Sequence, residues 1–224
     1  MNGPNLKLLF YSASLTKRQK YCIAVAALYA AGLRDDATAV IEKAVTADRM
    51  PRRLFSELFI HLSLFLGFPT MLEGLERLKS INSSNMKEPK LNNRRKSFGK
   101  GMRVFQKVYG DQTKKVLLKL GGLHKEVVLW IIQEAYGRVF TRSGLSLGER
   151  ELVNVVVLGI QGFTPQFFSH LRGALRVGVS SQGAMDTLNC IASCSRIEKR
   201  ASLRMLNQIT RMMHPRKPSI DFQT

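Results

Sequence analysis

Two stretches of the chain carry the same landmarks 130 positions apart, as Gly32 and Gly162 show. Residues 15–21 and 145–151 each hold a capping box, in which a hydroxyl residue is followed three positions later by Gln or Glu. The two side chains of a capping box satisfy free amides at the start of a helix. The other matched pairs are Thr16 with Ser146, Gln19 with Glu149 and Ala44 with Ala174. We therefore predict an internal repeat of one helical unit.

The repeat decides the secondary structure of its first element. Leu152–Ile160 is rich in valine and would on its own suit a buried strand. Its counterpart, Cys22–Ala31, is rich in alanine, the strongest helix former. Since two copies of one unit should share their secondary structure, both segments are predicted to be helices, and each ends near its matched glycine as a C-cap.

Two further helices are expected in each copy. Asp35 or Asp36 can cap the second helix in the first copy, and Thr164 can do so in the second copy, with Pro165 in the first turn. The third helices are predicted at Arg52–Phe65 and at about Gln182–Cys194. Each unit is then a helical hairpin with one packing helix. The predicted fold class is all-α, with two tandem helical-hairpin repeats packed into one unit.

The rest of the chain flanks or connects the repeats. We predict a basic N-terminal arm over 1–14, a first degenerate repeat over 15–81, a basic linker over 82–97, a second repeat with its preceding helices over 98–213, and a tail over 214–224. The preceding helices are expected around Gly101–Tyr109 and Glu126–Tyr136. The longest nearly unbroken apolar stretch, Tyr21–Leu33, is too short to cross a bilayer, so no membrane insertion is expected.

Several motifs resemble the carboxymuconolactone decarboxylase and alkylhydroperoxidase D superfamily. They are Trp130–Val139, Arg142–Ser146, Glu149–Leu152 and His170–Ala174 in the second copy, and Phe65–Pro69 in the first, which is similar to the family's glycine-aromatic-proline helix ending. The resemblance covers most of residues 15–80 and 98–195. It implies the fold, but not one chemistry, because the family includes several.

The hydroperoxidase branch of this family uses a Cys-x-x-Cys pair between a glutamate and a histidine, and the pair cycles through a disulfide. The resemblance places the glutamate at Glu151 and the histidine at His170, but Phe163 and Gln166 stand at the two cysteine positions. Thiol peroxidase activity is therefore not expected. The cysteines of this chain are Cys22, Cys190 and Cys194. They are expected to be free core thiols in a reducing compartment.

The decarboxylase branch needs no cysteines. If this chain is an enzyme, the resemblance implies a cofactor-free carbon–carbon lyase, with Glu151 as base, His170 as acid and Arg150 as the anchor of a substrate carboxylate. Whether Glu151 and His170 meet stays open, because Glu151 lies eleven residues before Gly162, roughly 16 Å along its helix. A satisfied core histidine and a carboxylate that complements a helix dipole are the alternative explanations.

No second site of this kind is expected. The counterparts of Glu151 and His170 in the first copy are Tyr21 and Val40. The remaining histidines show no metal-ligand spacing with acids or cysteines, so neither a metal nor another cofactor is expected. They are His61, His124 and His214.

Charge is the strongest argument for a different role. The chain holds 35 Lys and Arg against 16 Asp and Glu, a net charge of +19. Such a chain repels itself unless an anionic partner compensates, and nucleic acid is the usual partner. The first basic cluster comprises Lys87, Lys90, Arg94, Arg95, Lys96, Lys100, Arg103, Lys107, Lys114, Lys115 and Lys119. The second comprises Arg196, Lys199, Arg200 and Arg204. These clusters exceed the need of a small anionic substrate, and a solvated face is the alternative.

Two hypotheses follow. The chain is either a non-catalytic structural subunit of an RNA-containing assembly of the mitochondrial-ribosome type, or the decarboxylase-like enzyme described above. The first predicts RNA and other protein subunits as partners, bound through charge and shape because no nucleic-acid-reading motif is present. The family resemblance suggests homo-oligomers, although the tandem repeat could satisfy that contact within one chain. The basic, acid-free first twenty residues favour the mitochondrial matrix, with the cytoplasm as the alternative.

Overall fold

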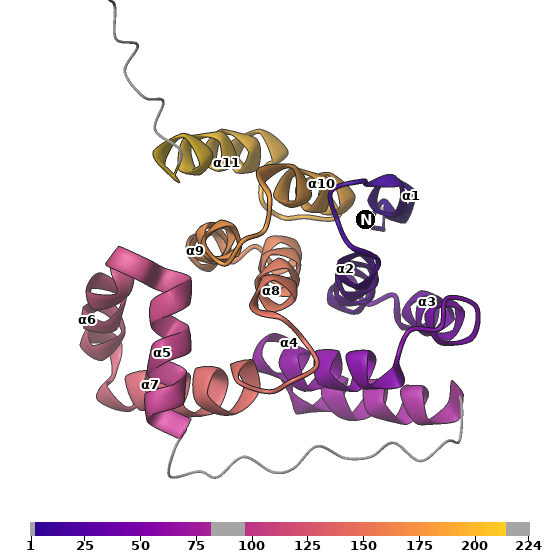
Figure 1. The fold of residues 1–224 in the computed structure, drawn as a ribbon, viewed down its shortest axis with the longest axis horizontal. Coiled ribbons are helices and arrows are strands. Elements are labelled where there is room, and N and C mark those ends of the chain that lie inside the picture. The colour runs from indigo at the N-terminus through magenta and orange to yellow at the C-terminus, as the bar shows by residue number, and fades with distance from the viewer. Residues whose placement is uncertain (1–2, 82–96, 214–224) are drawn as a thin grey trace, which may run out of the picture.

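The computed structural model describes residues 3–81 and 97–213, and these are helical apart from short turns, with no strand among them (Figure 1). The helices are α1 (Leu6–Tyr11), α2 (Lys17–Ala30), α3 (Arg34–Thr46), α4 (Arg52–Ile81), α5 (Ser97–Tyr109), α6 (Thr113–Leu123), α7 (Lys125–Trp130), α8 (Leu147–Gln161), α9 (Thr164–Arg176), α10 (Ser181–Ile191) and α11 (Lys199–Met213), with a short 3-10 turn at Gly110–Gln112 and a π-helix, η3, at Ile131–Phe140. The predicted all-α class is confirmed.

The two copies of the repeat form the centre of the molecule. Helices α2 and α8 start 130 positions apart, and so do α3 and α9. Figure 1 shows them side by side in the order α9, α8, α2, α3, so that the first helices of the two copies pack against each other. Helix α8 is buried on every side from Glu149 to Ile160. A helix surrounded in this way can be apolar all round, which explains the valine-rich segment that would also suit a strand.

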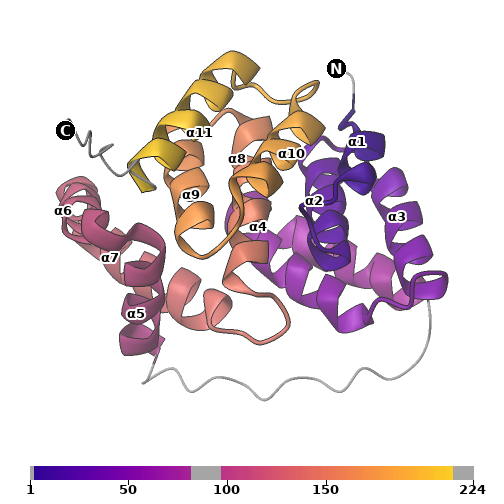
Figure 2. The ribbon, with the colours of Figure 1, turned by 45° about the horizontal axis from the view of Figure 1, so that its top comes forward.

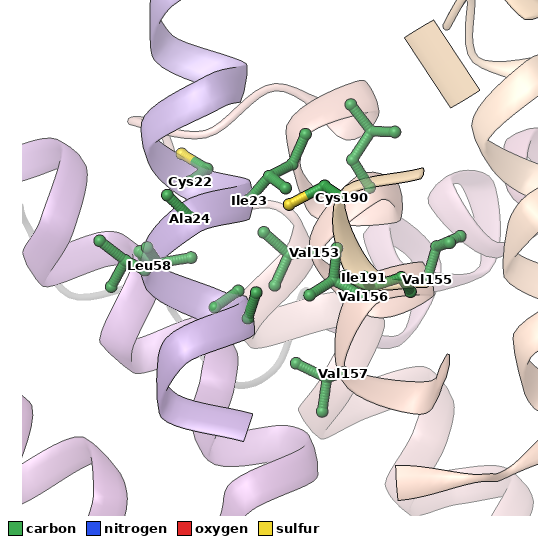
Figure 3. Close-up of a cluster of buried hydrophobic side chains, with 14 of the residues drawn as sticks. Cys22, Ile23, Ala24, Leu58, Val153, Val155, Val156, Val157, Cys190 and Ile191 are labelled. Carbon is green, nitrogen blue, oxygen red and sulfur yellow. The ribbon is translucent and has the colours of Figure 1, made fainter. Parts of the chain in front are cut away.

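The central interface is filled by small and branched side chains. Figure 3 shows Ala24 and Leu58 of the first copy together with Val153 and Val157 of the second, and each of these four residues is fully buried. Cys22 and Cys190 lie in the same core, and the free, buried state of all three cysteines confirms the prediction of core thiols. The sequence predicted one helix over about Gln182–Cys194. Helix α10 instead ends at Ile191, so Cys194 lies beyond its end.

The helix ends agree with the sequence in part. Both capping boxes are present, and Gly32 and Gly162 take positive φ angles of 79° and 84° after their helices. The predicted caps of the second helices are wrong: the N-cap residues are Leu33 and Phe163, neither with a side-chain bond. The candidates proposed for that role, Asp35, Asp36 and Thr164, instead lie in the first turn, where the two aspartates favour the helix dipole.

Helix α4 is a hairpin of two helical halves. Gly67 interrupts it with a φ of 80° and a ψ of 171°. Arg52 donates to the carbonyl of Leu78 at 2.5 Å, whereas a straight helix would separate these residues by roughly 39 Å. By length and composition α4 is the one helix of the described chain that could cross a membrane. Because the chain reverses at Gly67, each half is shorter than the roughly 20 residues that a span needs.

A second, smaller core lies beside α9. It is formed by Phe105, Val108, Ile132, Tyr136 and Phe140, from α5 and η3. In Figure 2 the unit of α5, α6 and α7 projects from the side of the bundle. The sequence predicted two helical stretches here and missed α6. Backbones approach closely at Gly101, where an added Cβ would lie 1.9 Å from the carbonyl of Ile132, so this crossing requires glycine.

The predicted N-terminal arm is partly folded. Residues Leu6–Tyr11 form α1, which packs against α10, and its Leu9 is fully buried. Because α1 carries its own apolar anchor, this segment belongs to the bundle. The predicted linker and tail fall almost wholly on residues 82–96 and 214–224, outside the described residues.

Candidate active site

A cluster of polar side chains lies inside the bundle where α4, α8 and α9 meet. Its members are each no more than 7% exposed. They are Glu57, His61, Arg150, Glu151, Asn154 and His170. Buried ionisable groups are costly unless they are hydrogen-bonded to one another. Their concentration at one place marks the candidate site.

Glu151 and His170 meet in this cluster. The Nδ1 atom of His170 lies 2.8 Å from Oε2 of Glu151. The question that the sequence left open is answered by the hairpin of α8 and α9: the two residues lie eleven positions before and eight positions after Gly162. Since antiparallel helices bring together residues at similar distances from their turn, the distance along α8 does not separate the pair.

A second histidine joins the pair through Asn154. The Oδ1 atom of Asn154 lies 2.7 Å from Nε2 of His61, and its Nδ2 lies 3.4 Å from Oε1 of Glu151 and 3.2 Å from Nδ1 of His170. Neither Asn154 nor His61 was predicted from the sequence to belong to a site. A signal was present for each: Asn154 interrupts an apolar helix one turn after Glu151, and His61 interrupts the apolar run of α4.

The donors and acceptors determine where the ring hydrogens lie. Arg150 Nη1 is 3.2 Å from His61 Nδ1, and a guanidinium can only donate, so this nitrogen accepts. The hydrogen of a neutral His61 is therefore on Nε2 and is donated to Asn154 Oδ1. The Asn154 amide then turns its hydrogens toward the side where Glu151 and His170 meet. An ionised Glu151 accepts the Nδ1 hydrogen of His170, which leaves Nε2 of His170 unprotonated and free to exchange a proton.

Burial keeps His61 neutral. Desolvation, followed by the charge of Arg150, lowers the pKa of His61 to about 3. Desolvation also lowers the pKa of Arg150 to about 10. At neutral pH this part of the cluster therefore carries the charge of Arg150 and none on His61.

Arg150 does not fit its predicted role as a substrate anchor. It is fully buried, and its Nη2 atom donates to the backbone carbonyl of Arg142 at 2.9 Å. Arg142 in turn binds Glu57 through two hydrogen bonds of 2.7 and 2.8 Å. The Arg150 guanidinium is thus a structural member of the cluster on the side away from His170, where a substrate carboxylate cannot reach it.

Aromatic rings surround the two histidines. The ring of Phe65 lies 6.2 Å from that of His170, and the ring of Tyr109 lies 6.4 Å from it. Burial raises the pKa of Tyr109 to about 12, so its hydroxyl stays protonated. Phe140, from the π-helix, packs edge-on against His61. Such π-helical segments are frequent at functional sites.

Of the two side chains of the pair, His170 is the one that reaches the surface. The side chain of His170 is 9% exposed, whereas that of Glu151 is fully buried. The larger cavities near the described residues are lined by other side chains, such as those of α5 and α6 or of Gly3, Ala31 and Cys194. A substrate would therefore have to reach the exposed part of the His170 side chain.

The matching place in the first copy is not polar. The positions of Glu151, Asn154 and His170 correspond to Tyr21, Ala24 and Val40, and that of His61 corresponds to Ile191. Tyr21, Ala24 and Ile191 are buried. The same helical framework can thus be built with largely apolar side chains, so packing alone does not require the polar cluster of the second copy.

The positions of the family's reactive thiols are filled by other side chains. Phe163 is 52% exposed, and Gln166 is also on the surface. Desolvation raises the pKa of Cys190 to about 12, which keeps that thiol protonated and unreactive. Among the described residues no group of three His, Cys, Asp or Glu side chains could hold a metal ion.

The basic clusters lie on exposed helical surfaces where they are described. Lys87, Lys90, Arg94, Arg95 and Lys96 fall outside the described residues. The remaining members are all exposed, on α5, on α6 and at or before α11. They are Lys100, Arg103, Lys107, Lys114, Lys115, Lys119, Arg196, Lys199, Arg200 and Arg204. None of these ten forms an ion pair with another described residue.

Comparison with known proteins agrees with the geometry. Residues 126–207 match the carboxymuconolactone decarboxylase family, and this range contains Glu151, Asn154 and His170. Peroxisomal protein 2 of Schizosaccharomyces pombe is 29% identical over 98 residues, which are 43% of this chain and 46% of that protein. The match thus spans about half the length of that relative. The resemblance seen in the motifs is thus supported over residues 126–207, where the chain matches the carboxymuconolactone decarboxylase family.

Proposed function

We propose that the chain is an acid–base enzyme that moves a proton through His170, in a cofactor-free reaction of the decarboxylase type. The observation that carries the proposal is the buried contact of 2.8 Å between His170 Nδ1 and Glu151 Oε2. A carboxylate in this position holds the imidazole in one tautomer and stabilises the imidazolium, as in hydrolase triads. The reactive atom is then His170 Nε2.

The reaction suited to this arrangement is loss of carbon dioxide from a carboxylated lactone. The bond between the carboxylate carbon and the ring breaks, and its electron pair is delocalised into the conjugated carbonyl as an enolate. His170 takes a proton from solvent at Nε2, and the resulting imidazolium gives this proton to the carbanionic carbon, which returns the ring to its neutral form with the hydrogen on Nδ1. Glu151 orients the ring and stays ionised, so its role is that of a positioning group and not of the base that the sequence suggested.

His170→Gln should lower kcat for decarboxylation of carboxylated lactones by about 10²–10⁴-fold, which is the usual share of general acid–base catalysis. Release of carbon dioxide, followed in a panel of such lactones, is the measurement. Product formed in D2O should carry one deuterium at the protonated carbon. Glu151→Gln should also lower kcat.

His124→Asn is the matched control, because His124 is an exposed histidine that caps α7 outside the cluster. Asn can cap a helix as well, so this variant should keep full activity. Turnover by the wild type with no loss in a folded His170→Gln variant would remove His170 from the mechanism.

The exposed basic clusters favour a second role, in which the protein binds RNA as a subunit of a ribonucleoprotein such as a mitochondrial ribosome. Ten exposed cations without ion-pair partners among the described residues are suited to phosphate backbones, where each neutralised phosphate releases counterions. In a native lysate, the protein should sediment with a large particle that ribonuclease collapses. A small species that ribonuclease does not change would contradict this role.

A further inference from the structure

The side chains around Glu151 and His170 come from both copies of the repeat. His61 belongs to α4 of the first copy, whereas Asn154 lies on α8 of the second. The bond of 2.7 Å between His61 Nε2 and Asn154 Oδ1 joins residues 93 positions apart in the chain. The first copy, which has no acid–base pair of its own, therefore supplies one end of the hydrogen-bond chain that reaches the pair.

This chain of hydrogen bonds has only one direction. Arg150 donates to His61 Nδ1, so His61 must donate to Asn154 Oδ1, and the Asn154 Nδ2 hydrogens then lie on the side of Glu151 Oε1, at 3.4 Å, and of His170 Nδ1, at 3.2 Å. If the amide were flipped, its oxygen would face the Glu151 carboxylate and its hydrogens would face the His61 donor. His61 therefore prevents the flip.

The titratable groups that face His61 come from α8 and α9. Arg150 is the nearest, at 3.2 Å, and His170, when it is protonated, also acts on it. Both disfavour protonation of His61, and the aromatic rings of Phe65 and Phe140 exclude water. His61 is thus a neutral donor over the whole pH range in which an acid–base enzyme works.

We propose that His61 is a positioning residue: through Asn154 it fixes the Glu151 carboxylate, which keeps the hydrogen of His170 on Nδ1 and leaves Nε2 for the substrate. The inference rests on the proposed function for its catalytic meaning. The tautomer of His170, which the proposal predicts, can be measured without any substrate.

Nitrogen-15 NMR of the two histidines at pH 7.5 is the test. In the wild type, His61 should carry its hydrogen on Nε2 and His170 on Nδ1. His61→Leu removes the donor, so the His170 nitrogen shifts should move toward the average of the two tautomers. His61→Gln should retain the wild-type shifts, because its amide can donate to Asn154 and accept from Arg150. His124→Asn serves as the control and should change nothing at His170.

Asn154→Ala provides an independent variant, because the first copy already holds Ala24 at this position of the same framework. It should shift the His170 nitrogens as His61→Leu does, and it decides the matter if His61→Leu does not fold. Unchanged His170 shifts in folded Asn154→Ala, or a wild-type His61 with its hydrogen on Nδ1, would overturn the proposal. A failed search for decarboxylase activity would leave these spectra unaltered, so the two failures can be told apart.

Discussion

Glu57→Gln should lower the free energy of unfolding by roughly 3–5 kcal/mol, the usual cost of breaking one side of a buried ion pair. Glu57 is 1% exposed, and its two oxygens accept from Nε and Nη2 of Arg142 at 2.7 and 2.8 Å. A glutamine has one acceptor and no charge, so Arg142 keeps a part-buried cation with half of its hydrogen bonds to residue 57. The change also removes the carboxylate that most favours the charged form of Arg150.

Urea denaturation of the wild type and the variant measures this loss. The matched control is Glu134→Gln, which breaks an exposed pair with Arg138 one helical turn away. Exposed pairs of this kind contribute about 0.5 kcal/mol or less. The double variant Glu57→Leu/Arg142→Leu should recover much of the loss, because replacing both partners with apolar groups leaves no uncompensated charge. A loss below about 1 kcal/mol for Glu57→Gln would mean that water screens the pair.

The repeat was predictable because it depends on local chemistry. Capping boxes at Thr16 and Ser146 and glycines at Gly32 and Gly162 act within one or two turns of their helix, so residue identity and spacing suffice to place them. The caps of α3 and α9 were not predictable in this way. Asp35 and Asp36 stand within two residues of the start of α3, Thr164 is the first residue of α9, and the exact turn geometry decided that none of them caps.

The candidate site was predictable only where the family resemblance named residues. Glu151 and His170 were identified by their motifs, but their contact depends on the register of the hairpin formed by α8 and α9. A distance along one helix says nothing about that register, which explains why the contact stayed open.

Glu57 and His61 were missed because their role depends on how the two copies pack. Their partners, Arg142 and Asn154, lie 85 and 93 positions away in the chain. The sequence does contain one sign of them: they are four residues apart, on one face of a largely apolar helix. Two polar residues on one face of a core helix indicate buried polar partners, but not which ones.

Because of His61, the free energy of unfolding should begin to fall at a pH well above that at which carboxylates titrate. Desolvation and the charge of Arg150 lower the pKa of His61 to about 3 in the folded state, against roughly 6.5 in the unfolded chain. Between these values the unfolded state binds one more proton, so the free energy of unfolding rises with pH in this window. The contribution is fully present above about pH 6.5 and falls away as the pH is lowered toward 3.

Between pH 7 and pH 4.5 this single group should reduce the free energy of unfolding by roughly 2–3 kcal/mol, and by roughly 4–5 kcal/mol at pH 3. Urea denaturation at a series of pH values measures the slope. His61→Gln removes the titrating ring and keeps the hydrogen bonds, so its curve should be flatter than that of the wild type by this amount. His124→Asn, which removes an exposed histidine, should reproduce the wild-type slope. Parallel curves for the wild type and His61→Gln would mean that the folded state accommodates a protonated His61. His61 would then no longer be a neutral donor to Asn154 below neutral pH.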